Sequence, residues 1–141
     1  MRILIIDGQG GGIGGRLVSQ LKPRLLPEWE LLVVGTNVLA TNAMLKAGAG
    51  RGATGENAIA VNAARADIIL GPIGIILANG LMGEVPATVA SAVSGAEGVK
   101  ILIPSHACGT LVAGTETMKL EDYLRHAVEL AVREMEKHAA G

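Results

Sequence analysis

Short apolar runs and segments of helical periodicity alternate along this chain. The runs typical of buried strands are Arg2–Ile6, Glu30–Val34, Asp67–Leu70 and Lys100–Ile103, and Thr110–Ala113 is a candidate fifth strand. Helices are predicted at residues 12–21, 37–47, 56–64 and 86–93. Strands that alternate with helices form right-handed βαβ units. The pattern therefore predicts an α/β fold, a three-layer sandwich around a mostly parallel sheet of about five strands.

The last predicted helix has the clearest pattern. Within Leu120–Met135, apolar residues recur at spacings of three and four, which places them on one face. Pairs of opposite charge four residues apart, such as Glu121 and Arg125, lie on the other face. This helix is expected to close over the sheet. Because no linker divides the sequence, residues 1–141 are predicted to form a single domain.

Composition and charge narrow the functions open to the chain. The formal net charge is −1 and there is one cysteine. A nucleic-acid partner needs a basic excess, and a lone cysteine makes no disulfide framework or multi-cysteine metal site. The longest uncharged stretch, residues 68–83, is too short and too rich in glycine to cross a bilayer. We expect a cytoplasmic protein that binds no nucleic acid, membrane or metal. Its aliphatic content predicts a homo-oligomer, a dimer, that associates through residues 75–85.

The main candidate site is the glycine-rich loop between the first predicted strand and the first predicted helix. G-x-G-x-x-G fits at Gly10, Gly12 and Gly15, and resembles the dinucleotide-binding fingerprint. G-x-x-x-G-x-G fits at Gly8, Gly12 and Gly14, and resembles the loop of short-chain dehydrogenases. Glycines let a ligand approach the backbone, and a helix N-terminus attracts anions. The predicted ligand-binding residues of this loop are Gly8, Gln9, Gly10, Gly11, Gly12, Ile13, Gly14 and Gly15.

Three features depart from a standard nicotinamide-dependent enzyme. Thr36 and Asn37 follow the second predicted strand, where the fingerprint expects an acidic residue for the ribose hydroxyls. Tyr123 is the only tyrosine, and Ala127 stands where a Tyr-x-x-x-Lys pair would place its lysine. Asp7 would repel a phosphate unless a cation or a ligand hydroxyl lay between them. We expect Thr36 and Asn37 to meet a ribose or a base.

Several blocks of the sequence resemble one family. They are Ile5–Gly14, Val34–Asn37, Ala53–Ala58, Gly71–Gly74 and Ile101–Pro104. Together they resemble a family of short bacterial proteins that is classed only as a domain of unknown function and has a Rossmann-like fold. The resemblance extends over essentially the full length. It implies a Rossmann-like sandwich and brings no established activity or site.

Two other glycine-containing segments are candidates for ligand contacts. Gly71, Pro72, Ile73 and Gly74 follow the third predicted strand. If this strand lies beside the first, they would form the wall opposite the first glycine loop, and a plain turn is the alternative. Glycines between residues 48 and 55 predict a second loop with a literal G-x-G-x-x-G. This loop follows a helix instead of a strand, so it is interpreted as a flexible connection. Its alternative role is a second anion contact through Arg51.

The leading hypothesis is a Rossmann-like module that binds a small phosphate-bearing ligand, a nucleotide or dinucleotide such as NAD(P). The first alternative is a small enzyme that uses Asp7, His106 or Cys108 near the loop, since a cysteine and a histidine can form a nucleophile and a base. The second alternative is a non-catalytic homo-oligomeric assembly protein. No complete catalytic set can be read from the residues.

Overall fold

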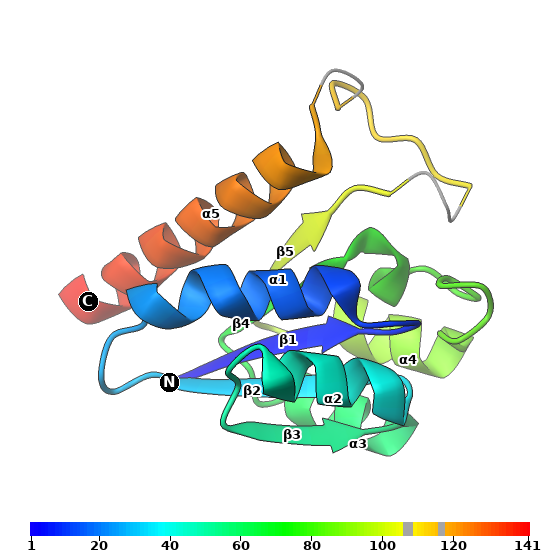
Figure 1. Ribbon diagram of the computed structural model, residues 1–141, viewed down its shortest axis with the longest axis horizontal. Coiled ribbons are helices and arrows are strands. Elements are labelled where there is room, and N and C mark those ends of the chain that lie inside the picture. The colour runs from blue at the N-terminus through cyan, green and yellow to red at the C-terminus, as the bar shows by residue number, and fades with distance from the viewer. Residues whose placement is uncertain (106–108, 116–117) are drawn as a thin grey trace.

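Five parallel strands form the centre of the computed structural model, which describes residues 1–105, 109–115 and 118–141. The strands are β1 (Arg2–Asp7), β2 (Glu30–Gly35), β3 (Arg51–Thr54), β4 (Ile68–Pro72) and β5 (Val99–Ile103). Their order across the sheet is β3-β2-β1-β4-β5, and every neighbouring pair is parallel (Figure 1). This is the strand order of a Rossmann-type sheet. The predicted Rossmann-like α/β sandwich with a parallel sheet of about five strands is confirmed.

The central strand, β1, is buried on both faces. Ile3 and Ile5 belong to one apolar cluster, while Leu4 and Ile6 belong to the other. Successive side chains of a strand point to opposite faces of the sheet, so these clusters lie on its two sides. A strand that is covered on both sides needs an unbroken apolar run, which is the pattern at the start of this sequence.

Helices form a layer on each face of the sheet (Figure 1). The helices on the face of Ile3 are α1 (Gly12–Leu21), α2 (Val38–Lys46) and α5 (Leu120–Ala140). The helices on the face of Leu4 are α3 (Glu56–Ala63) and α4 (Ala87–Ser94). Two short 3-10 helices, η1 (Lys22–Arg24) and η2 (Ile73–Ile76), continue α1 and β4. Within the described ranges, no helix combines the length and apolar character needed to cross a membrane.

The prediction of a loop over residues 48–55 is wrong at Arg51–Thr54, which form the edge strand β3 and pair with β2. Gly52 explains why the pattern was misleading. A Cβ at this position would lie 3.0 Å from Val33 Cγ2 and 3.1 Å from Leu45 Cδ2, a side-chain atom of α2. The glycine therefore allows α2 to pack closely on an edge strand, and it does not mark a turn.

Two further predictions about strands are corrected. Thr110–Ala113 belongs to none of the strands in the part of the chain that the structure describes, and the fifth strand is β3. Its composition favours an extended conformation, but a strand also needs a neighbouring edge with which to pair. The third predicted strand is longer than expected, because Gly71 and Pro72 belong to β4 and pair with β5.

Residues 75–85 do not form the apolar contact surface that was predicted. Ile75 and Val85 are fully buried and pack in the cluster beneath α3 and α4. Met82 is the one large apolar side chain of this segment that is strongly exposed. The apolar character of the segment therefore reflects its contribution to the core.

Candidate functional site

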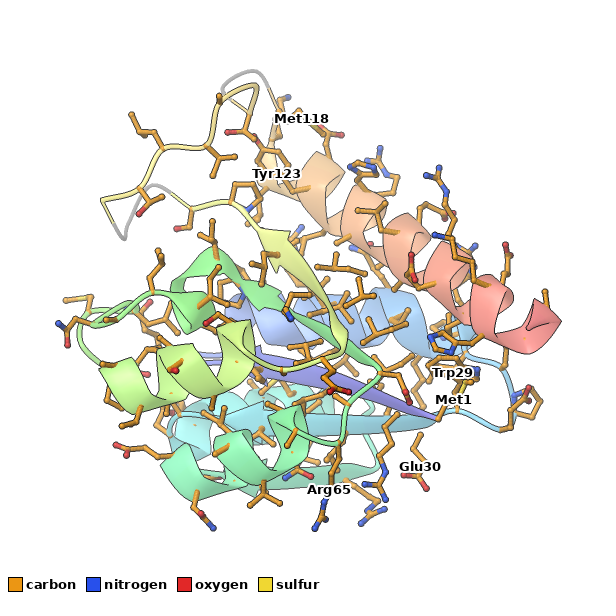
Figure 2. The ribbon with its side chains drawn as sticks, turned by 180° about the vertical axis from the view of Figure 1, so that it is seen from behind. Met1, Trp29, Glu30, Arg65, Met118 and Tyr123 are labelled. Carbon is orange, nitrogen blue, oxygen red and sulfur yellow. The ribbon has the colours of Figure 1, made fainter. Side chains whose placement is uncertain are left out.

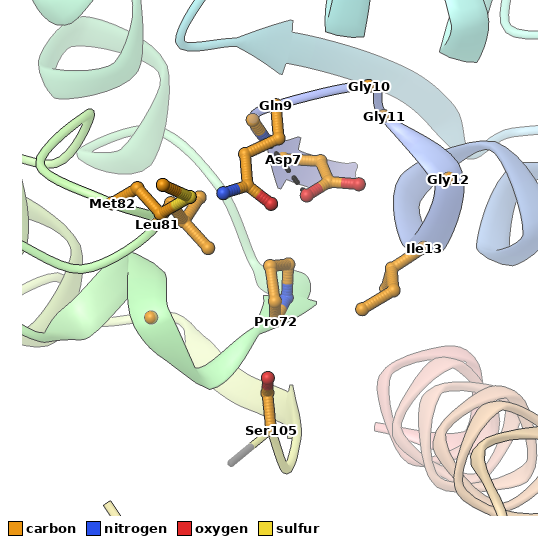
Figure 3. A pocket seen from close by; sticks show the side chains of 12 residues that line it. Asp7, Gln9, Gly10, Gly11, Gly12, Ile13, Pro72, Leu81, Met82 and Ser105 are labelled. Atoms are coloured by element: carbon orange, nitrogen blue, oxygen red, sulfur yellow. Dashed lines mark hydrogen bonds between the residues drawn. The ribbon is translucent and has the colours of Figure 1, made fainter. Parts of the chain in front are cut away.

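A cavity of about 220 Å³ lies at the carboxyl ends of β1 and β4. The connection from β1 to β2 runs through α1 on one face of the sheet, and the connection from β3 to β4 runs through α3 on the other face. Such a reversal leaves a crevice between the two strands, which is where open α/β sheets bind ligands. Figure 3 shows Leu81 and Met82 on one side of the cavity and Ile13 on the other.

Eight of the residues predicted to bind a ligand line this cavity. They are Gly8, Gln9, Gly10, Gly11, Gly12, Ile13, Pro72 and Gly74. The other predicted residues lie outside its lining: Gly14, Gly15, Thr36, Asn37, Gly71 and Ile73. The lining also includes Asp7, Leu81, Met82 and Ser105, of which only Asp7 was considered. His106 and Cys108 fall outside the residues that the structure describes.

Asp7 is the last residue of β1 and its side chain is buried. Its Oδ1 accepts a hydrogen bond from the backbone N–H of Gly8 at 2.8 Å, and its Oδ2 accepts one from Gly14 at 2.6 Å. Burial raises the pKa of the Asp7 carboxyl, although the hydrogen bonds from Gly14 and Gly8 partly offset this rise. The nearby charge of Glu84 raises the pKa further. The carboxyl therefore closes the glycine loop from inside the protein.

The glycine loop presents several backbone donors at the start of α1. Gly11 adopts a left-handed conformation with φ 72° and is the N-cap residue. The backbone N–H groups of Gly10, Gly12 and Ile13 have no hydrogen-bond partner among the described residues. Unpaired donors at a helix N-terminus, together with the helix dipole, favour an anion there. These three N–H groups are the part of the site suited to a phosphate.

The glycines of the loop differ in what surrounds them. A Cβ added to Gly10 or Gly12 would have no atom within 4 Å. A Cβ added to Gly8 would lie 2.5 Å from Thr36 Oγ1, and one added to Gly14 would lie 2.5 Å from Met44 Sδ. Packing therefore requires glycine at positions 8 and 14, while position 12 is open. Gly8 and Gly14, the two glycines that packing requires, both belong to the G-x-x-x-G-x-G pattern. None of the glycines of the G-x-G-x-x-G pattern, Gly10, Gly12 and Gly15, is required in this way, so the first pattern fits better.

Glu84 is a component of the site that sequence reasoning missed. Its Oε1 accepts hydrogen bonds from the Gln9 backbone N–H at 2.8 Å, from Thr36 Oγ1 at 2.5 Å and from Asn37 Nδ2 at 3.0 Å. Desolvation acts to raise the pKa of Glu84, but these three hydrogen bonds together lower it. The one available signal was its position as the first charge after the uncharged residues 68–83.

Thr36 and Asn37 contact the glycine loop through Glu84. Asn37 also caps α2, since its Oδ1 accepts a hydrogen bond from the Ala40 N–H at 2.9 Å. Its Nδ2 donates a second hydrogen bond to the backbone oxygen of Gln9 at 3.0 Å. Both side chains thus hold the loop in place, and their contact with a ribose or base stays a prediction.

Strained backbone surrounds the cavity. Gln9, Leu81 and Met82 have φ values of 49°, 53° and 56°, and all three line the cavity. Asn79, with φ 64°, lies in the same connection as Leu81 and Met82. Residues other than glycine rarely adopt this conformation, and such residues concentrate at ligand sites. Met82 is 89% exposed, so the core does not explain its position.

The described part of the site offers carboxyls, backbone and side-chain amides, and the hydroxyl of Ser105. No group of three or more histidine, cysteine, aspartate or glutamate side chains is placed to hold a metal ion among the described residues. Asp7 and Glu84 are the carboxyls beside the loop, and backbone N–H groups are its donors. The arrangement is suited to binding an anion next to a buried carboxyl.

A solved structure of comparable length shares this fold at low sequence identity. A dodecameric FMN-dependent UbiX-like decarboxylase from Escherichia coli O157:H7 aligns with a TM-score of 0.50 and 16% identity, over 99% of this chain and 95% of that chain. A Bacillus thuringiensis protein assigned as an NADPH:quinone reductase aligns with a TM-score of 0.41 and 18% identity, over 94% of this chain and 45% of that chain. At 16% identity the likeness to the decarboxylase concerns the fold alone.

The family comparison covers almost the whole sequence. No curated protein matches the chain. The model of one family matches residues 2–136, which include every strand and the glycine loop. The chain therefore belongs to the family described as a domain of unknown function, DUF3842.

Proposed function

We propose that this protein binds a phosphate-bearing ligand, a nucleotide or dinucleotide, at the glycine loop between β1 and α1. One observation carries the proposal: Gly10 and Gly12 line the cavity at positions where the fold itself does not require glycine. Neither residue has a left-handed φ, and neither faces an atom that a Cβ would meet. A ligand that approaches the backbone closely accounts for glycine at both positions.

The hydrogen bonds of the loop support a phosphate over other groups. Asp7 and Glu84 would repel a phosphate, but Asp7 directs both of its oxygens, and Glu84 its Oε1, at donors of the protein. The donors left over are the N–H groups of Gly10, Gly12 and Ile13. Gly12 and Ile13 begin the first turn of α1, where the helix dipole is positive, and Gly10 lies just before the N-cap residue.

The size of the cavity indicates how such a ligand is held. Its volume of about 220 Å³ is below the roughly 300 Å³ of the smallest sites for drug-sized molecules. A phosphate and part of a ribose fit in this space. The base or flavin ring of the ligand then lies at the opening of the cavity, beside Met82. The E. coli structure with this fold is described as FMN-dependent, and FMN belongs to the proposed ligand class.

Catalysis in the same cavity is a second candidate function. The specific observation is that burial raises the pKa of Asp7 at the wall of the cavity, and groups with perturbed pKa values concentrate at catalytic sites. Once a ligand is identified, Asp7→Asn separates the two functions. Loss of turnover with an unchanged Kd supports an enzyme, and the absence of turnover in the wild-type protein supports a binding module.

The proposal is tested by thermal shift with NAD(H), NADP(H), FMN, FAD, ATP, GTP and coenzyme A, followed by calorimetric titration of any compound that shifts Tm. A ligand at 100 times its Kd adds about 2.7 kcal/mol, which raises Tm by on the order of 10 °C in a domain of this size. Gly12→Val should abolish binding, because its side chain fills the approach to the backbone, while leaving the Tm of the free protein nearly unchanged.

Gly15→Ala is the matched control. This residue is a glycine of the same helix, its Cβ would meet only ordinary contacts at 3.6 Å or more, and it lies outside the cavity lining. It should bind the ligand as the wild-type protein does. A flat panel, or equal affinity in the wild-type and Gly12→Val proteins, would contradict the proposal.

A further inference from the structure

A groove of about 450 Å³ runs between the outer edge of β5 and α5. Its walls are mostly apolar and include Val99, Ile101, Leu102, Met118, Tyr123 and Leu130. β5 pairs with β4 along its inner edge only, so its outer edge has no neighbouring strand within the described residues. Figure 2 shows Met118 and Tyr123 near the start of α5, at one end of the groove. An open strand edge beside an apolar groove is a template for another strand.

The connection between β5 and α5 contains a segment with the composition of such a strand. Thr110–Ala113 is uncharged and rich in β-branched and aliphatic residues. Gly109 and Gly114 bracket it with φ values of 68° and 85°. Leu111 is 80% exposed and Val112 is also exposed. We call this segment, residues 109–115, the arm, and Figure 1 shows it extending away from the sheet beyond β5.

We propose that the arm of one copy of this chain adds to the outer edge of β5 in a second copy, so that two copies exchange arms. Each copy then gains a sixth strand and covers the groove. The exchange is symmetric, since both copies offer the same arm and the same edge. Addition of a strand to an open edge supplies main-chain hydrogen bonds, and side chains such as Leu111 fill the apolar groove.

Charge favours the arm as the occupant of this groove. The Lys100 ammonium donates a hydrogen bond to the backbone oxygen of Ala96, and Glu134 pairs with Lys137 at 3.0 Å. Lys100 and Glu134 therefore each have a partner, and apart from His126 the rest of the lining is uncharged, so the groove favours an uncharged segment. The arm brings no charge of its own. The arm does not fill the groove of its own chain. Of residues 109–115, only Thr115 lines that groove, at one end of it.

The first test measures molar mass by light scattering coupled to size exclusion. We expect the wild-type protein to be a dimer and Leu111→Asp to be a monomer, because a carboxylate cannot enter the apolar groove. Leu39→Asp is the control, since Leu39 is 68% exposed on α2, which packs on β2 and β3, at the end of the sheet opposite β5. It should remain dimeric. A monomeric wild-type protein, or a Leu111→Asp protein that stays dimeric, overturns the proposal.

The second test identifies the contact. Leu111→Cys and Val99→Cys are introduced together in a chain whose one native cysteine is removed by Cys108→Ser, and the protein is oxidised. Val99 is exposed at the groove. A disulfide between two chains on a non-reducing gel, absent from each single-cysteine variant, is the expected result. A disulfide within one chain would show that the arm folds onto its own edge, and would overturn the exchange.

Discussion

Asp7 and Gly14 connect the end of β1 to the first turn of α1: the carboxylate Oδ2 accepts the Gly14 backbone N–H at 2.6 Å. The N-cap residue of α1 is a glycine, which has no side chain to cap the helix. A carboxyl from the preceding strand therefore takes this role. As a consequence, the loop between the two residues is held closed, and Gly10, Gly12 and Ile13, whose N–H groups have no partner among the described residues, line the cavity.

Gly14→Ala should destabilise the protein. The new Cβ would lie 2.5 Å from Met44 Sδ of α2 and 2.9 Å from Asp7 Cβ of β1, so α1 or these side chains must shift. Overpacking of this kind costs about 1–3 kcal/mol. Gly15→Ala is the control on the next residue of the same helix, where only ordinary contacts form. It should be neutral or add up to about 1 kcal/mol through helix propensity. Urea unfolding of both variants measures the difference, and equal stabilities would show that the close contact at Gly14 is unimportant.

Stability should depend on pH through Asp7, with a sign opposite to that of most carboxyls. Burial raises the pKa of Asp7 above its ordinary value of 3.8, so the native state binds this proton more tightly than the unfolded chain does. The contribution of Asp7 to the free energy of unfolding is therefore largest below 3.8 and falls as the pH rises through the native pKa. Urea unfolding at a series of pH values, from below 3.8 to neutral, should show this fall in the wild-type protein and not in Asp7→Asn.

Glu84 provides the contrasting control in the same experiment. Its hydrogen bonds lower its pKa below the ordinary value of 4.5. The stability that Glu84 contributes is therefore present above 4.5 and is lost as the pH falls through its native pKa. The difference between the wild-type protein and Glu84→Gln should shrink on acidification, whereas the difference between the wild-type protein and Asp7→Asn should change in the opposite direction. The same trend in both variants would refute the assignment for Asp7.

Met82→Gly should stabilise the free protein. A left-handed conformation costs a residue other than glycine about 1–2 kcal/mol, and glycine loses about 0.5–1 kcal/mol of chain entropy in return. Because the side chain is exposed, no core contact is lost, and a gain of up to about 1 kcal/mol is expected.

Val61→Gly, in the helical backbone of α3, is the control and should instead lower stability by at least about 0.5 kcal/mol. If Met82 lies against the ring of a bound nucleotide, the more stable variant will also bind more weakly. A loss of stability in Met82→Gly would show that the strain is absent.

The hydrophobic pattern predicted those strands that are buried on both faces of the sheet, because such strands need an unbroken apolar run. The runs that became β1, β2, β4 and β5 are apolar because helices cover the sheet on both faces. The edge strand β3 could not be recognised in this way. Much of it is exposed, and Gly52 allows the close packing of α2 on the strand instead of marking a turn. Thr110–Ala113 has the composition of a strand but belongs to none of the strands in the described ranges, because local composition does not report on pairing.

The candidate site divides in the same way. The sequence alone determined that a glycine-rich turn joins the first strand to the first helix, because that turn needs only residues adjacent in the chain. Only the tertiary structure decided that Glu84 reaches Gln9, Thr36 and Asn37 from a distant segment. It also decided which glycines are open to a ligand, since that depends on atoms of α2 and β1. Local conformation follows from local sequence, whereas contacts between distant segments depend on how the helices cross the sheet.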